Sequence, residues 1–218
     1  MRWIITTVVV VLLLAGAWFL REPLMGLFFS TVPEPVPEEP APTVPITSTY
    51  ASSTLGYSFE YPSDFNIDET YAYPFSETKT IPGVAVAIGG SAAGTNLSTD
   101  TKVSIEQLTR AAICTADIFM IDDVVATTVT DTETQVEYSL ATSSSAGAGN
   151  VYDEVVYALP DSKPCTAVRY QIHSTNIANY PEGTVTEYNQ AALIEEFNAI
   201  RRSLTFVAAP TEAEEETE

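Results

Sequence analysis

The sequence predicts an α+β domain, an antiparallel sheet flanked by helices, preceded by one N-terminal transmembrane helix. Three observations carry this prediction: an apolar run near the N-terminus, several short segments in which apolar and polar residues alternate, and one stripe of apolar residues at helical spacing near the C-terminus. A period of two is typical of strands with one buried face, and a period near 3.6 is typical of an amphipathic helix. A chain of 218 residues has room for one domain of ordinary size.

The apolar run extends without charge or proline from Trp3 to Leu20. As a helix it would span about 27 Å, close to the thickness of the hydrocarbon core of a bilayer. We therefore expect residues 1–22 to be a membrane anchor, in contact with lipid through the run itself, with the C-terminal domain on the extracytoplasmic side. The alternative is a signal peptide and secretion after cleavage near Ala17, because Arg2, a 12-residue apolar stretch and the small residues 15–17 together resemble a cleavable leader.

The next segment, residues 23–45, is rich in proline and glutamate. Alternating proline prevents helix formation and ladder pairing and favours an extended chain, so we expect a stalk. Residues 46–208 then form the extracytoplasmic α+β domain. Residues 209–218 are acidic, and we expect this tail to be disordered because it has little apolar surface to bury.

The charge balance excludes one class of partner. The chain has 29 acidic and nine basic residues, which gives a formal net charge of −20. Such a surface repels phosphate backbones, so we expect no nucleic-acid binding. The charge is also typical of a soluble domain that faces a salty exterior.

Two cysteines, Cys114 and Cys165, are present. In an exported domain they are expected to form a disulfide, and two free buried thiols are the alternative. The chain has one histidine and no pair of cysteines at metal-ligand spacing, so we expect no metal site and no cofactor.

The clearest strand signal is in residues 57–61, where Tyr57, Phe59 and Tyr61 alternate with polar residues after a turn at Gly56. Small residues predict a loop at 143–150, and a short helix is expected at 115–121. Further strands are expected at residues 84–88, 102–106, 124–129, 135–140, 151–159 and 167–174.

One helix is expected near the C-terminus. Asn189 is a suitable N-cap, and Arg201 and Arg202 suit the negative end of the helix dipole. Residues 204–206 are expected to close the fold as a strand. The apolar stripe of the helix consists of Leu193, Phe197, Ile200 and Leu204.

Two segments resemble PsbP-like domains. Residues 55–65 read LGYSFEYPSDF, which resembles the opening hairpin of that family, and residues 197–206 read FNAIRRSLTF, which resembles its closing helix and strand. The resemblance implies an antiparallel sheet flanked by helices and carries over no catalytic or metal-binding residue. The stretch HSTNI at 173–177 is similar to uncharacterised exported proteins of small-genome candidate-phylum bacteria. Residues 89–163 match neither pattern.

The candidate ligand-binding residues are Tyr71, Tyr73 and His173. The tyrosines belong to a cluster of aromatics that would serve either as a stacking platform or as core residues. His173 is the only histidine, but the chain lacks the nucleophile elbow that a Ser/His/Asp set requires. Ser91 and Ser174 are the candidate nucleophiles. Adjacent acids, such as Asp153 and Glu154, point to opposite faces of a strand and do not form a catalytic carboxylate pair.

No catalytic constellation is present, so we expect a membrane-anchored extracytoplasmic binding or envelope-interaction module whose ligand the sequence does not specify. One alternative is an extracytoplasmic hydrolase that uses His173 with nearby carboxylates. A second alternative is an assembly factor for a membrane complex.

Overall fold

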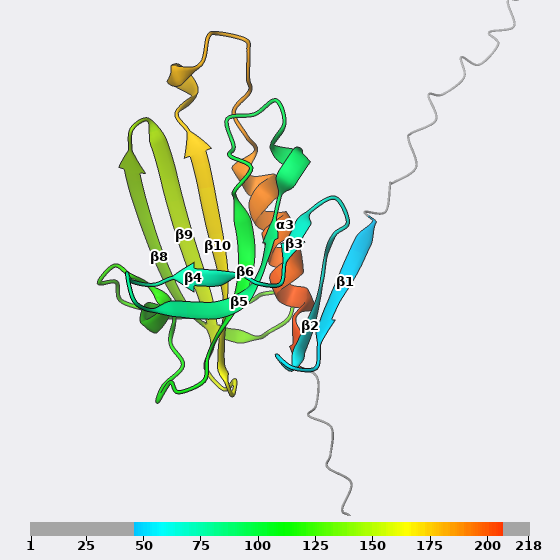
Figure 1. Ribbon diagram of the computed structural model, residues 1–218, viewed down its shortest axis with the longest axis vertical. Helices are drawn as coiled ribbons and strands as arrows, with labels where there is room; N and C mark the ends of the chain where they lie inside the picture. The colour runs from blue at the N-terminus through cyan, green and yellow to red at the C-terminus, as the bar shows by residue number, and fades with distance from the viewer. Residues whose placement is uncertain (1–45, 207–218) are drawn as a thin grey trace, which may run out of the picture. The chain divides into compact units, whose positions relative to one another are not determined.

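The computed structural model describes residues 46–206 (Figure 1). The anchor, the stalk and the acidic tail expected from the sequence lie outside the described residues. Within residues 46–206, no helix is both long enough and apolar enough to cross a membrane.

A large antiparallel sheet dominates the domain. Figure 1 shows its β8, β9 and β10 side by side on the left, with β1 and β2 of a second sheet on the right. The strands of the large sheet follow the spatial order β3 (Asn66–Asp68), β5 (Thr80–Ala87), β6 (Lys102–Leu108), β10 (Cys165–Thr175), β9 (Asn150–Leu159), β8 (Glu137–Gly147) and β7 (Thr127–Thr130), and β4 (Ala72–Pro74) pairs with β5.

The small sheet consists of β1 (Thr47–Ser52), β2 (Tyr57–Pro62) and β11 (Thr205–Phe206). β11 pairs with β2 in the register Thr205 to Ser58, so the two segments that resemble PsbP-like domains meet in space. The predicted strand at 57–61, its turn at Gly56 and the closing strand are confirmed.

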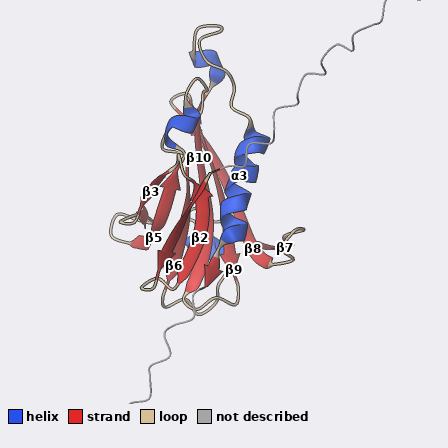
Figure 2. Cartoon of the chain, turned by 90° about the vertical axis from the view of Figure 1, so that its right-hand side faces the viewer, coloured by secondary structure: helices blue, strands red, loops and turns tan. Residues whose placement is uncertain are grey.

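One α-helix, α3 (Gln190–Ser203), is present among the described residues, and Figure 2 shows it beside the strands. The side-chain oxygen of Asn189 accepts a hydrogen bond from the amide of Ala192 at 3.1 Å, which confirms the predicted N-cap. The helix buries Leu193, Phe197 and Ile200 against one face of the large sheet, which we call the helix face.

Alternate residues of β10 face opposite ways, because successive side chains of a strand point to opposite faces. Val168, Tyr170 and Ile172 lie on the helix face, together with Tyr57 and Phe59 of the small sheet. The helix and the small sheet therefore share one core.

The opposite face of the large sheet, which we call the loop face, is covered by residues 109–126 and by β4. Phe119 and Met120 are buried there against Val156 and Ala167 of the sheet. This cover contains only a single turn of 3₁₀-helix, η2 (Ala116–Phe119), where a short helix was expected. The prediction of helices flanking the sheet is therefore corrected: in the described residues one α-helix covers one face, and the other face has an irregular cover that is held by its contacts with the strands. Two further 3₁₀ turns are η1 (Gly89–Ala92) and η3 (Ile177–Asn179).

The predicted loop at residues 143–150 is wrong for most of its length. β8 continues to Gly147, the chain turns through Ala148 and Gly149, and β9 begins at Asn150. The two turn residues have φ angles of 51° and 82°, as a two-residue hairpin turn requires. Serine and alanine carry no strand signal of their own, and pairing with β9 supplies the ladder that the sequence pattern does not reveal.

Candidate functional site

The largest buried charged group of the domain is the guanidinium of Arg169 on β10. It donates to both carboxylate oxygens of Glu106, each at 2.8 Å, and its Nη1 lies 2.9 Å from Oε1 of Glu154. The side chains of Arg169 and Glu106 are fully buried, and Glu154 is 16% exposed. β6, β10 and β9 are neighbouring strands, so the alternation of each strand places the three side chains together on the loop face.

The remaining surface of this guanidinium is also occupied. Nη2 donates to the carbonyl of Phe119 at 2.8 Å, and the ring of Tyr73 lies 3.6 Å from the guanidinium carbon. Burial by itself lowers the pKa of Arg169, but the hydrogen bonds and charge of Glu106 raise it overall. The group is therefore permanently charged and has no face left for a ligand, which makes it a structural centre.

The two candidate tyrosines lie beside this centre on the loop face. Tyr73 is 5% exposed, and its hydroxyl donates to Oε1 of Glu154 at 3.0 Å. Tyr71 is half-buried, its hydroxyl has no hydrogen-bond partner among the described residues, and the ammonium of Lys102 lies 5.7 Å from the centroid of its ring. Burial raises the pKa of both hydroxyls, so both are neutral at physiological pH.

His173 lies on the same face, further along β10. Its Nδ1 is 2.8 Å from Oδ1 of Asp100, and its ring stacks on Tyr152 with 4.4 Å between the ring centroids. Burial alone would raise the pKa of Asp100, but hydrogen bonds from Ser98 and His173 lower it overall. β9 connects the candidate residues. Its Tyr152 contacts His173, and its Glu154, two residues further along the strand, contacts Tyr73.

Among residues 46–206, no nucleophile completes a hydrolase site at His173. Its Nε2 is buried and has no hydrogen-bond partner among the described residues. Ser174 follows His173 on a strand and points to the helix face, and Ser91 donates to Asp64 at 2.9 Å. Across residues 46–206, no group of three or more His, Cys, Asp or Glu side chains gathers as metal ligands do.

The expected disulfide between Cys114 and Cys165 is confirmed, with 5.3 Å between the Cα atoms. It joins the cover of the loop face to the first residue of β10. Both cysteines are buried. The loop cover is thereby held at the lower end of the large sheet as it is drawn in Figure 1.

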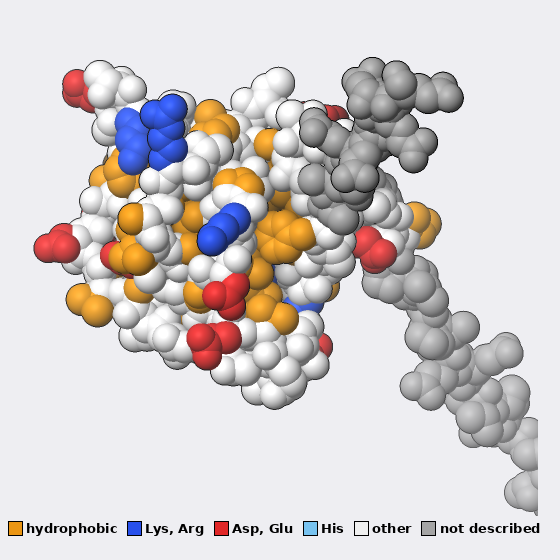
Figure 3. Space-filling model, turned by 90° about the horizontal axis from the view of Figure 1, so that it is seen from below, with side chains coloured by type: hydrophobic (Ala, Val, Ile, Leu, Met, Phe, Trp, Pro, Cys, Tyr) orange, Lys and Arg blue, Asp and Glu red, His pale blue; other side chains and the backbone are white. Residues whose placement is uncertain are grey.

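Two adjoining cavities of about 690 and 1050 Å³ lie at this lower end, and we call them together the lower-end groove. Figure 3 views the domain from this end and shows hydrophobic side chains gathered in the middle of the face, with a basic side chain among them. The two cavities share the residues Thr109, Pro160, Ser162, Lys163 and Pro164.

The groove exposes large apolar side chains. Ile113 lines the smaller cavity and is 66% exposed, and Phe206 lines the larger one and is 47% exposed. The exposed Lys163 lines both cavities, and Glu137 and Asp161 line the larger one. Apolar surface of this extent with a few charged groups is typical of a binding site.

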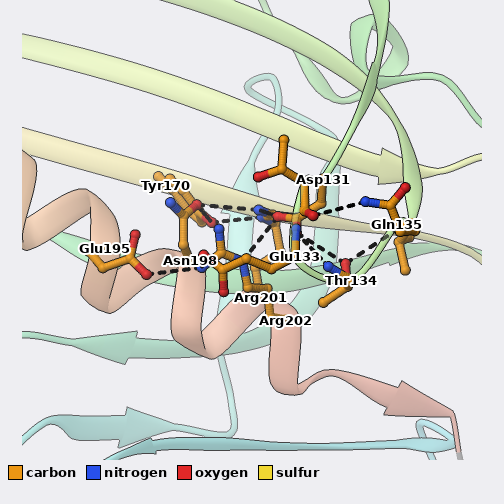
Figure 4. A network of polar contacts seen from close by, with 11 residues as sticks. Asp131, Glu133, Thr134, Gln135, Tyr170, Glu195, Asn198, Arg201 and Arg202 are labelled. Carbon is orange, nitrogen blue, oxygen red and sulfur yellow. Dashed lines mark hydrogen bonds and ion pairs between the residues drawn. The ribbon is translucent and has the colours of Figure 1, made fainter.

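A second polar cluster joins α3 to the turn between β7 and β8 (Figure 4). Asp131 accepts from Nη2 of Arg201 at 2.6 Å and from Nε of Arg202 at 3.0 Å. Its other oxygen accepts from the amides of Glu133 and Thr134, both at 2.9 Å. Burial alone would raise the pKa of Asp131, but the amide bonds and the two guanidinium groups lower it well below its usual range.

The ion pairs use much of the domain's positive charge. Residues 46–206 contain 20 acidic and seven basic residues. Arg169, Arg201 and Arg202 are committed to ion pairs inside the fold. Four basic residues make no ion pair among the described residues, and Lys163 is the one that lines the groove. They are Lys79, Lys102, Arg110 and Lys163.

No family model matches the chain, and neither does any curated protein. A crystal structure of a protein from Bacteroides thetaiotaomicron VPI-5482 is similar at 11% identity and a TM-score of 0.37, over 72% of this chain and 47% of that one. The chain thus spans about half the length of that protein. The solution structure of cyanobacterial PsbP (CyanoP) from Synechocystis sp. PCC 6803 is similar at 12% identity and a TM-score of 0.32, over 78% of this chain and 99% of that one.

These similarities concern the arrangement of elements, and no functional argument rests on them. The resemblance expected from residues 55–65 and 197–206 agrees with the similarity to CyanoP in fold alone. The identity and the TM-score are too low to assign the chain to the PsbP-like family. The resemblance to proteins of candidate-phylum bacteria stays a prediction.

Sequence reasoning missed the groove and the Arg169 centre. Ile113, Lys163 and Phe206 are far apart in the chain, and none belongs to a motif. The sequence carries no signal for the centre: in the predicted strands Glu106 and Arg169 alternate with apolar residues, a pattern typical of side chains that face solvent.

Removing the disulfide should destabilise the domain. The bridge closes a separation of 51 residues, and the chain-entropy account gives a loss of about 4 kcal/mol for the variant in which both Cys114 and Cys165 are replaced by serine. Urea unfolding checks this value. The wild-type chain kept in reductant is the matched control and should unfold with the double variant. Alkylation of either cysteine in the unreduced wild type would contradict the bridge.

Replacing Asp131 should change the dependence of stability on pH. The folded pKa of Asp131 lies below its unfolded value, so its stabilisation is present above about pH 4 and fades as the pH falls. Asp131→Asn should therefore cost about 3 kcal/mol at pH 7 and progressively less below about pH 4. Denaturant unfolding across pH measures the difference. Asp123→Asn, at an exposed position, should show little difference at any pH, and a pH-independent loss in Asp131→Asn would contradict the argument.

Proposed function

We propose that this chain is a non-enzymatic binding module, anchored in a membrane through residues 3–20, whose lower-end groove holds an apolar segment of a partner protein on the extracytoplasmic side. The observation that carries the proposal is the groove itself, in which exposed Ile113 and Phe206 each line one cavity and Lys163 lines both. Exposed apolar side chains gathered at a groove mark interaction sites on protein surfaces.

The charges in and around the groove favour a protein segment as the occupant. The surface of the domain is acidic, and Lys163 is the basic group that lines the groove. A segment with one or two apolar side chains and a neighbouring carboxylate would fill the cavities and pair with Lys163. A strongly anionic ligand, such as a nucleic acid, would meet the acidic surface before it reached this single ammonium.

The disulfide supports the extracytoplasmic part of the proposal. Bridges such as Cys114–Cys165 persist in oxidising compartments and are rare in the cytosol. Export of the domain requires a leader or an anchor, and the apolar run of residues 3–20 has the length and composition of one.

Substitution in the groove should weaken binding of the partner. In the full-length chain in its native membrane, a photo-crosslinking residue that replaces Ile113 should form a covalent adduct with the partner, which can then be identified. The same residue in place of the exposed Thr128 on β7 should form none. Ile113→Glu and Phe206→Glu should then weaken binding of the purified partner at least about tenfold, or about 1.4 kcal/mol.

Val125→Glu is the matched control for these variants, because Val125 is 88% exposed and does not line the groove. Equal binding by all three variants would overturn the assignment of the groove. A partner that is a subunit of a membrane complex would favour the role of assembly factor, and any other partner would favour the envelope module.

The hydrolase alternative is supported by one observation, the short contact between His173 and Asp100. The absence of a hydroxyl or thiol at Nε2 among the described residues opposes it. We expect the wild-type chain and His173→Ala to be equally inactive on ester, amide and glycoside substrates, and to bind the partner equally well. Turnover by the wild type that is lost in a folded His173→Ala variant would overturn the binding-module proposal.

A further inference from the structure

The upper part of β8 has a neighbour on one side only. β9 pairs with β8 as far as Gly147 of β8. The pairing of β7 with β8 ends earlier, at the pair of Thr127 in β7 with Leu140 in β8. Residues 141–147 therefore form an open edge, and in Figure 1 they lie on the left-hand border of the sheet. Most of these residues are exposed.

The backbone groups that point out from this edge follow from the ladder. In an antiparallel pair, successive residues direct their N–H and C=O groups alternately to one neighbour and to the other. The two-residue turn makes Gly147 and Asn150 a hydrogen-bonded pair, so odd-numbered residues of β8 bond to β9. The bond from the amide of Asp131 to the carbonyl of Val136 shows that even-numbered residues bond outward, towards β7.

Beyond Leu140 the outward residues are Thr142, Ser144 and Ala146. Their three N–H and three C=O groups have no backbone partner among the described residues. Such an edge is a template for another strand unless charge, proline or a bulge blocks it. From Tyr138 to Tyr152 the sequence has no charged residue and no proline.

The other edges of the large sheet are different. β3 has three residues and β7 has four, so each offers little to pair with. In the small sheet, β11 has two residues and β1 has six. β1 is thus the main competitor of β8 for an incoming strand, and the experiment must separate the two.

We infer that the open edge of β8 is an interface with a second copy of this chain, in which two β8 strands pair antiparallel about a two-fold axis at Ser144. In this register Ser144 pairs with Ser144 of the other copy, and Thr142 pairs with Ala146 on both sides of the axis. All six outward backbone groups then form hydrogen bonds. Self-pairing of one patch about a two-fold axis is the commonest form of association between identical chains.

The length of the edge supports this occupant. Seven open residues of one copy lie opposite the same seven residues of the other. Past Gly147 the second copy turns back through Ala148 towards its own β9, and this turn lies where β7 of the first copy begins at Thr127. A longer strand from another protein would run into β7.

Charge also supports it. Each chain has a net charge of −20, so two copies repel one another over most of their surfaces. The paired segment carries no charge, the hydroxyl of Ser144 donates to Asp153 at 2.6 Å, and Glu154 forms an ion pair with Arg169. The remaining repulsion is long-range and is screened by salt. Seven residues a side is a small interface, so we expect a weak dimer that strengthens as the salt concentration rises.

Single-cysteine variants of the full-length chain test the register. Paired residues across the axis have Cα atoms about 5.5 Å apart, within reach of a short thiol-reactive crosslinker. Ser144→Cys should therefore give a covalent dimer. Thr142→Cys, about 14 Å from its copy, should not. Thr49→Cys, at the exposed centre of β1, should not either. The native cysteines are bridged and do not react.

A proline variant tests the backbone bonds. Ser144→Pro removes an N–H that points out of the sheet and leaves the ladder to β9 intact, whereas Ser144→Ala keeps it. Sedimentation between about 0.05 and about 0.5 M salt should show salt-strengthened dimers for the wild type and Ser144→Ala, and monomers for Ser144→Pro. Ile113→Glu should still dimerise, which separates this interface from the groove.

The crosslinking pattern decides the inference even if Ser144→Pro fails to fold. Crosslinking of Thr49→Cys without Ser144→Cys would assign the contact to β1 and overturn the proposal. Equal crosslinking of Ser144→Cys and Thr142→Cys would indicate random collision and would also overturn it.

Discussion

The guanidinium of Arg169 joins the three central strands of the large sheet to the cover of its loop face. Its partners are Glu106 and Glu154 on neighbouring strands and the carbonyl of Phe119 in the cover. A buried charge without its partners would cost several kcal/mol, so these elements are constrained to meet in one register. Placement of Tyr152 and His173 on the loop face follows from this register, because a slip of one residue would send every side chain of a strand to the other face.

The two ends of the large sheet differ in what they offer to a partner. At the lower end the disulfide holds the loop cover against β10, and the apolar side chains beside it form a groove. At the upper end β8 extends beyond β7, and its outward backbone N–H and C=O groups are left unpaired among the described residues. Side chains give a groove its specificity, whereas an open edge accepts a strand through main-chain hydrogen bonds. The two surfaces are therefore suited to different partners, and a substitution in one surface should weaken binding there without affecting the other.

Much of the fold could be predicted from local pattern. The strand at residues 57–61, the helix with its cap at Asn189 and the disulfide follow from alternation, helical spacing and compartment. Residues 143–147 could not be recognised as a strand, because serine and alanine have no strand preference and their ladder depends on β9. The loop cover could not be foreseen either, since its burial depends on contacts with strands distant in the sequence.

The candidate site shows the same division. The sequence alone identified His173 as the single imidazole, the acidic surface, the cysteine pair and the absence of a nucleophile motif, because these are properties of composition and local order. Only the tertiary structure decided that His173 meets Asp100, that Tyr73 is buried under Arg169, and that Ile113, Lys163 and Phe206 line adjoining cavities at one end of the domain. These relations join residues far apart in the chain, and strand order and register, which set them, are absent from any local pattern.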